Sequence, residues 1–211
     1  PSVWTWQNQV LVVPGDGGIF YQILAGASAI GGSGVSATLA LPADAREVQV
    51  LGDDLSGHQL IRGADRSLGL ELGWKTRGQL ERQIAISYQL PRRPLDPVWK
   101  LQAPSGPGED STRSRFIIMS SPQLVYAADG LAGPFPSKGL PASFAEVIDG
   151  NPCYQLESAS TADLKVDLLP VVATAEATVS EAMWVVKLEP DGAMLVEGAM
   201  SLEHRGMLPV M

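Results

Sequence analysis

The sequence predicts an all-β fold, mostly antiparallel and β-sandwich-like, with few or no long helices. Apolar residues alternate with polar or small ones along several short runs, as they do in strands that bury one face. Gly (22 residues) and Pro (16 residues) are dispersed between these runs, where they favour turns. The hydrophobic fraction of 45% is enough for a full core, so most of the chain is expected to fold.

Strand patterns begin close to the N-terminus. A compact apolar run at 10–13 and a second at 19–24 flank the glycine-rich turn 15–18. Alternation at 35–41 stops at Pro42, and a further short strand at 48–50 ends at the turn 52–54. These segments predict antiparallel strands joined by short turns.

The clearest alternation falls between residues 68 and 90. Over 80–90 one face carries Leu80, Arg82, Ile84, Ile86, Tyr88 and Leu90. The other face carries Glu81, Gln83, Ala85, Ser87 and Gln89, which predicts a half-buried strand. Just before it, Leu68, Leu70, Leu72 and Trp74 alternate with small or polar residues. The segment 75–78 is predicted to be the connecting turn, with Gly78 able to adopt a positive φ.

The later part of the chain contains a hairpin signal and two weak helix signals. Apolar runs at 184–188 and 194–202 flank Pro190-Asp191-Gly192, which favours a hairpin over 183–203. The segments 141–147 and 158–163 are candidates for single helical turns. In the first, Ser143 is a candidate N-cap with Glu146 three residues later.

A change in composition at 104–113 predicts a boundary. This segment is polar, rich in Gly, Pro and Ser, and free of large apolar residues. It is expected to be a linker or a surface loop. The sequence therefore predicts two β subdomains, a sandwich-like module at 1–103 and a second β region at 114–211.

A weak internal similarity relates the two ends of the chain. Asp16-Gly17 and Asp191-Gly192 each lie between apolar runs. One hypothesis is that the hairpin 183–203 begins a truncated repeat of the first module. The alternative is that two unrelated hairpins share Asp-Gly because that dipeptide suits a tight turn.

Composition disfavours several functions. The net charge is −8, with 15 Lys and Arg against 23 Asp and Glu, and no basic stripe forms. Nucleic-acid binding is disfavoured because it requires clustered cations on the protein. No run of about 18 apolar residues occurs, so no membrane insertion of this segment is expected. The single cysteine, Cys153, precludes an intramolecular disulfide and leaves the compartment open.

The sequence predicts no catalytic residue, no metal ligand set and no cofactor. The histidines, His58 and His204, are not tied by any motif to a nucleophile, and Cys153 has no partner that would lower its pKa. Trp4 and Trp6 are two residues apart, so they share one face of a strand. They are the candidate ligand-binding residues, as a platform for sugar rings, with burial in the core as the alternative.

These observations favour a non-catalytic structural or protein-interaction β module of a larger protein. We expect that protein to belong to the bacterial envelope or to lie outside the cell, in the periplasm or at the surface. The expected partners are other proteins or other domains of the same chain, which bind to surfaces or sheet edges. One alternative is a carbohydrate-binding β-sandwich module. The other is a hydrolase fragment, for which a deep pocket that gathers acids or His58 would be evidence.

Overall fold

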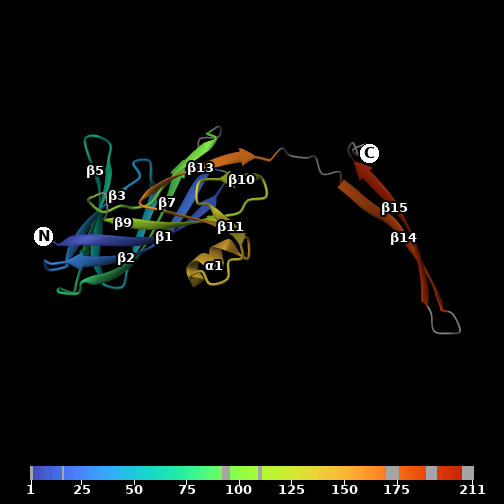
Figure 1. Ribbon diagram of the computed structural model, residues 1–211, viewed down its shortest axis with the longest axis horizontal. Helices are drawn as coiled ribbons and strands as arrows, with labels where there is room; N and C mark the ends of the chain where they lie inside the picture. The colour runs from blue at the N-terminus through green and yellow to red at the C-terminus, as the bar shows by residue number, and fades with distance from the viewer. Residues whose placement is uncertain are drawn as a thin grey trace. The chain divides into compact units, whose positions relative to one another are not determined.

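The computed structural model describes residues 2–15, 17–91, 96–108, 111–169, 176–188 and 194–205. The chain divides into two compact units, Pro1–Leu168 and Leu169–Met211 (Figure 1). Both are built from strands, and most of the strand pairs are antiparallel. The all-β prediction is therefore confirmed.

The first unit contains thirteen strands and one short helix among its described residues. The strands of its first half are β1 (Val3–Pro14), β2 (Gly18–Ile30), β3 (Ser36–Leu41), β4 (Arg46–Leu51), β5 (Leu55–Arg62), β6 (Leu68–Trp74) and β7 (Glu81–Pro91). Its second half contains β8 (Val98–Gln102), β9 (Thr112–Met119), β10 (Leu124–Ala127), β11 (Ala132–Phe135), α1 (Ala142–Ile148), β12 (Cys153–Ser158) and β13 (Thr161–Leu168).

These strands form one large sheet and two small ones. The large sheet has seven strands in the order β11-β12-β9-β1-β2-β7-β4. The pair β1–β9 is parallel, and its other pairs are antiparallel. The small sheets have the orders β3-β6-β5 and β10-β13-β8.

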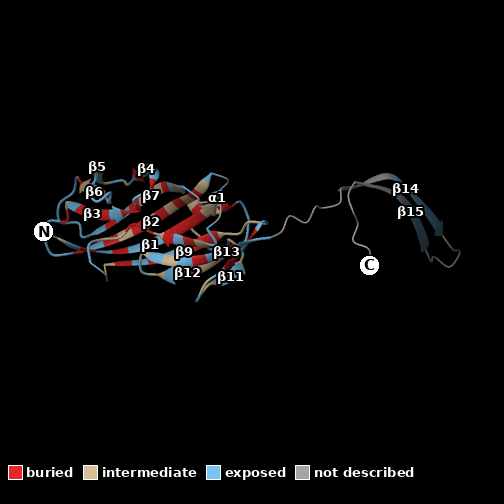
Figure 2. Cartoon of the chain, turned by 90° about the horizontal axis from the view of Figure 1, so that it is seen from above, coloured by how far each residue is buried: buried red, intermediate tan, exposed pale blue. Residues whose placement is uncertain are grey.

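The main core lies between the seven-stranded sheet and the small sheets. Alternate residues of β1, β2 and β7 are buried, and they share one cluster with residues of β3, β6, β8 and β13. Figure 2 shows these buried positions as red segments along the strands. Sheets packed face to face in this way form a sandwich.

A second, smaller cluster lies on the outer face of the seven-stranded sheet. Phe144 and Ile148 of α1 pack there against Leu11, Ile117 and Cys153. The helix therefore covers the outer face at one end of the strands. The remainder of that face is not covered by the helix, and the candidate site lies there.

The alternation predicted at 68–90 is confirmed by burial. Arg82, Ile84, Ile86 and Tyr88 are buried in β7. Leu80 precedes the strand and is exposed, because β7 begins at Glu81. Gly78 has the expected positive φ of 79°.

The turn at 75–78 does not close a hairpin between neighbouring strands. β6 lies in a small sheet, and β7 lies in the seven-stranded sheet, so the turn carries the chain from one layer to the other. Alternation gives the face that a strand buries, but not the sheet to which it belongs.

The described residues of 104–111 connect β8 to β9 inside the first unit, and residues 112–113 already belong to β9. Ser105 pairs with Ala40 of β3, and the Pro104 carbonyl accepts a hydrogen bond from Asn8 of β1. The strand after the loop, β9, pairs with β1. The two compact units of the structure meet at Leu168–Leu169, whereas the sequence-based prediction placed a boundary at 104–113. The composition is that of a solvent-facing segment, and such segments occur inside domains as well as between them.

The two helix signals have different outcomes. The first corresponds to α1, but its N-cap position is Pro141, without a side-chain hydrogen bond, so Ser143 does not cap it. The second, 158–163, contains no helix: residues 159–160 form a bend, and the others belong to the ends of β12 and β13. Among the described residues, no helix has the length and apolar character that crossing a membrane would require.

The second unit contains the predicted hairpin. It consists of β14 (Glu176–Leu188) and β15 (Met194–Arg205), which pair antiparallel from Leu188↔Met194 to Glu176↔Arg205. Its turn, with Pro190, Asp191 and Gly192, lies outside the described residues, as does Asp16 of the first hairpin. The repeat hypothesis therefore remains a prediction.

Candidate functional site

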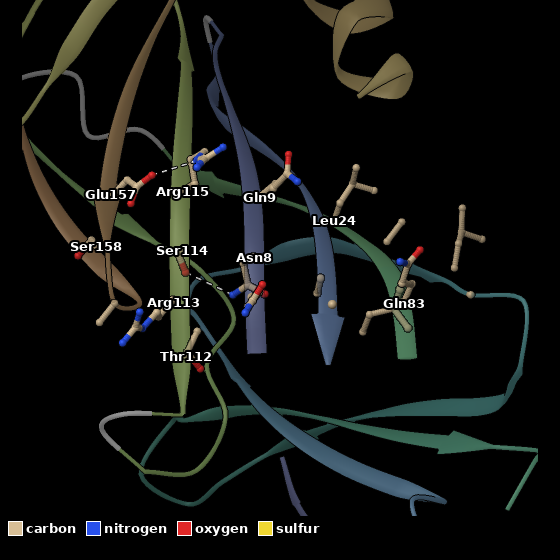
Figure 3. A pocket seen from close by; sticks show the side chains of 18 of the residues that line it. Asn8, Gln9, Leu24, Gln83, Thr112, Arg113, Ser114, Arg115, Glu157 and Ser158 are labelled. Atoms are coloured by element: carbon tan, nitrogen blue, oxygen red, sulfur yellow. Dashed lines mark hydrogen bonds and ion pairs between the residues drawn. The ribbon is translucent and has the colours of Figure 1, made fainter. Parts of the chain in front are cut away.

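An open groove of about 1170 Å³ lies on the outer face of the seven-stranded sheet (Figure 3). It occupies the part of that face that α1 leaves uncovered. β1, β9, β2 and β7 supply most of its side chains. Successive residues along a strand point to opposite faces of the sheet. The residues that alternate in sequence with the buried core residues therefore line the groove.

The groove contains two rows of side chains across the strands. In one row, Arg113 pairs with Gln7, Gln7 with Gly26, and Gly26 with Gln83. The second row runs through Glu157, Arg115, Gln9, Leu24, Ala85 and Leu51. We call these two rows the polar groove. Gly26 and Ala85 have little or no side chain, so they form the bottom of the groove, and the longer glutamine and arginine side chains surround them.

The charges of the polar groove are concentrated at its β9 side. Arg115 Nε donates to Glu157 Oε1 at 3.1 Å, and Gln155 Nε2 donates to the same oxygen at 3.3 Å. Arg113 forms no ion pair among the residues that the structure describes. Asp53 lies at the opposite side, after β4. Within the described part of the chain, the Arg113 guanidinium therefore has no counter-ion at the β9 side.

The two carboxylates of the groove are too far apart to work as a pair. Glu157 lies on β12 and Asp53 follows β4, which are separated by five strand spacings in the sheet. At about 4.8 Å per spacing, this separation is roughly 20 Å or more. A glycosidase pair requires about 5–10 Å. Glu157 and Asp53 therefore do not form a pair of the glycosidase type.

The predicted platform of Trp4 and Trp6 lies in the core. The two residues share a face, as expected, but that face is the buried one, and they are only 4% and 1% exposed. Trp4 Nε1 donates to the Ser36 carbonyl at 2.8 Å, and its ring lies 5.0 Å from that of Trp74. Gly106 lies against Trp6, so closely that a Cβ there would be 2.8 Å from the ring. The structure therefore places both rings in the core, which is the alternative that the sequence left open.

The other reactive side chains considered from the sequence lie apart from the groove. His58 is on β5, in a small sheet, and is exposed. Cys153 is buried beneath α1, and burial raises the pKa of its thiol. The His204 side chain lies outside the described residues. The structure gathers none of these with a partner suited to catalysis among the residues that it describes.

The residues of the polar groove were missed by the sequence analysis. Glutamine and arginine on the polar face of a strand have the same pattern as an ordinary solvated face. Only the register of the strands places Arg113, Gln7 and Gln83 in one row.

No family model and no curated protein matches this sequence.

Proposed function

We propose that this chain is a non-catalytic structural or protein-interaction β module of a larger protein. The observation that carries the proposal is the apolar face of the hairpin β14–β15. Separation of the two carboxylates in the polar groove supports the non-catalytic part.

The two faces of the hairpin differ in character. Trp184 is opposite Gly198 and Val186 is opposite Val196, so these four residues share one face. Trp184 is 61% exposed and Val186 is 55% exposed. The opposite face is mixed: it carries the exposed Met183 and Val185 together with an ion pair in which Lys187 Nζ lies 3.6 Å from Glu197 Oε2.

A two-stranded hairpin is marginal in water unless another layer covers its apolar face. The Trp184 ring already lies across Gly198, where an added Cβ would be 2.3 Å from the ring, but the outer side of this face stays exposed. Contiguous exposed apolar surface of this kind is typical of interaction sites.

The first hairpin of the chain indicates what covers such a face. β1 and β2 have 12 and 13 residues, and β14 and β15 have 13 and 12. The apolar face of β1–β2 is covered by the small three-stranded sheets. We infer that β14–β15 is covered in the same way, by a β-sheet layer that the larger protein supplies.

The experiment measures the exposure of Trp184 in this 211-residue chain and in the complete product of its gene. The fluorescence of Trp184 is obtained as the difference between the native sequence and Trp184→Phe, and acrylamide is the quencher. We expect ready quenching in the 211-residue chain and quenching as weak as that of a buried tryptophan in the complete product. Trp99→Phe is the matched control, because Trp99 is buried in the first unit.

An equally strong quenching of Trp184 in both proteins would contradict the proposal, because the apolar face would then lack a cover. A Trp184 already protected in the 211-residue chain would also contradict it.

A further inference from the structure

We propose that the polar groove of the first unit binds an acidic oligosaccharide. Arg113 would hold a carboxylate of a uronic acid, and the amides of Gln7, Gln9 and Gln83 would hold ring hydroxyls. This inference goes beyond the proposed function and does not depend on it, because the groove and the hairpin belong to different units.

The side chains of the groove match the hydrogen-bonding character of a sugar. A glutamine amide offers both donors and an acceptor, so it can bind the paired hydroxyls of a pyranose, each of which also donates and accepts. Gln7 and Gln9 are two residues apart on β1 and point to the same face, about 6.7 Å apart along the strand. Gln83 lies two strands away in the row of Gln7. The three amides therefore surround one low floor.

That floor suits the flat face of a sugar ring. Gly26 separates Gln7 from Gln83, and Ala85 and Leu24 continue the floor into the second row. Small and aliphatic residues leave room for a ring and contact its C–H groups, while the polar groups around them fix its orientation. An aromatic ring is not needed for this mode of binding.

The charge distribution favours an acidic sugar over a neutral one. Glu157 is engaged by Arg115 and Gln155, but Arg113 has no such partner among the residues that the structure describes. A guanidinium can bind a carboxylate through two parallel hydrogen bonds. Asp53, at the far side of the groove, would repel a second carboxylate but can accept hydrogen bonds from hydroxyls.

A peptide is less suited to this surface. An extended peptide usually adds to the edge of a sheet, where it pairs with free main-chain groups. The groove lies instead on a face, and β9, β1, β2 and β7 already have a paired strand on both sides. Recognition here must come from side chains, which favours a polyhydroxylated ligand.

The test is isothermal titration calorimetry of the full chain with four oligosaccharides. A chelator is present, so that calcium cannot bridge the acidic sugars to carboxylates of the protein. The acidic probes are a hexamer of galacturonic acid and a hexamer that alternates glucuronic acid with N-acetylglucosamine. The neutral probes are hexamers of glucose and of N-acetylglucosamine. We expect at least one acidic probe to bind, and the neutral probes to bind about tenfold or more weakly, because a charge-assisted hydrogen bond to Arg113 is lost.

Variants then assign the site. Arg113→Met is expected to weaken binding of the acidic probe about tenfold or more, and Gln83→Ala to weaken all binding. Arg62→Met is the matched control, because Arg62 is an exposed arginine on β5, away from the groove. Unchanged thermal unfolding temperatures would show that the exposed substitutions leave the fold intact.

Three results would overturn the inference. They are an absence of binding by both acidic probes at millimolar concentration, equal binding of acidic and neutral probes, and binding that Arg113→Met and Arg62→Met affect equally. Each of them leaves the proposal about the hairpin unaffected, since that proposal is tested by the exposure of Trp184.

Discussion

Arg82 lies on the buried face of β7, where its side chain is only 2% exposed. Its guanidinium donates to Asp54, to the Gln79 side chain at 3.0 Å, and to the carbonyls of Gly34 and Thr76. It also lies 5.3 Å from the centre of the Trp74 ring. One side chain therefore holds together three loops at the end of the sandwich opposite α1.

Replacement of Arg82 by Met removes these donors and leaves several acceptors without a partner. We expect the free energy of unfolding to fall by roughly 2–4 kcal/mol, since removal of one member of a buried polar network is costly. Urea denaturation measures it. The exposed Arg62→Met is the control and should change stability by no more than about 0.5 kcal/mol. Equal effects of the two substitutions would contradict this role of Arg82.

Asp54 adds a pH dependence at the same place. Hydrogen bonds from the Thr76 side chain, together with Arg82, hold the pKa of the Asp54 carboxyl below its ordinary value. A lowered pKa in the folded state means that ionised Asp54 stabilises the fold above about pH 4, its ordinary pKa. This contribution is lost as the pH falls through the lowered value.

We therefore expect Asp54→Asn to destabilise the protein at neutral pH and to have a smaller effect as the pH falls below about 4. Urea denaturation of both proteins at several pH values checks this. A difference in stability that does not depend on pH would rule out the ionised carboxyl as its cause.

At the scale of elements, α1 is short but well anchored. It has seven residues, too few for a stable isolated helix, so tertiary contacts must hold it. Phe144 is fully buried against Leu11 and Ile117 of the seven-stranded sheet. The helix thus closes one end of the outer face.

Phe144→Ala is expected to lower the free energy of unfolding by about 3–5 kcal/mol, because it leaves a cavity under the helix. Val147→Ala, at an exposed position of the same helix, should have little effect. A small loss for Phe144→Ala would mean that α1 is not anchored through this side chain.

The sequence predicts individual elements better than their assembly. The alternation of β6 and β7 predicted their buried faces, because burial on one side imposes a period of two. The same pattern could not tell that β6 and β7 lie in different sheets, since that depends on distant partners. Trp4 and Trp6 illustrate the same limit for site prediction. Their spacing predicts that they share a face of the strand, but not whether that face is buried or exposed.

The polar groove could not be predicted from the sequence for a related reason. Gln7, Gln83 and Arg113 come from three separate strands, and the parallel pairing of β1 with β9 brings Arg113 to Gln7. A parallel pair between strands so far apart leaves no local signal in the sequence.

At the scale of the whole molecule, the two units differ in how they are stabilised. The first has two layers and a core that includes Trp6, Tyr21, Tyr88 and Phe116. The second, considered by itself, is one hairpin with apolar side chains in solvent. Among the residues that the structure describes, the layered packing that a stable β domain requires is present in the first unit and not in the hairpin.

Hydrogen–deuterium exchange of the 211-residue chain tests this difference most directly. We expect amides of β1, β2, β7 and β9 to exchange slowly, through opening free energies that approach the global stability. We expect amides of β14 and β15 to exchange rapidly, because the described residues of the second unit include no second layer over the hairpin. Protection of β14 and β15 equal to that of β1 and β2 would contradict the account, since the hairpin would then need no partner.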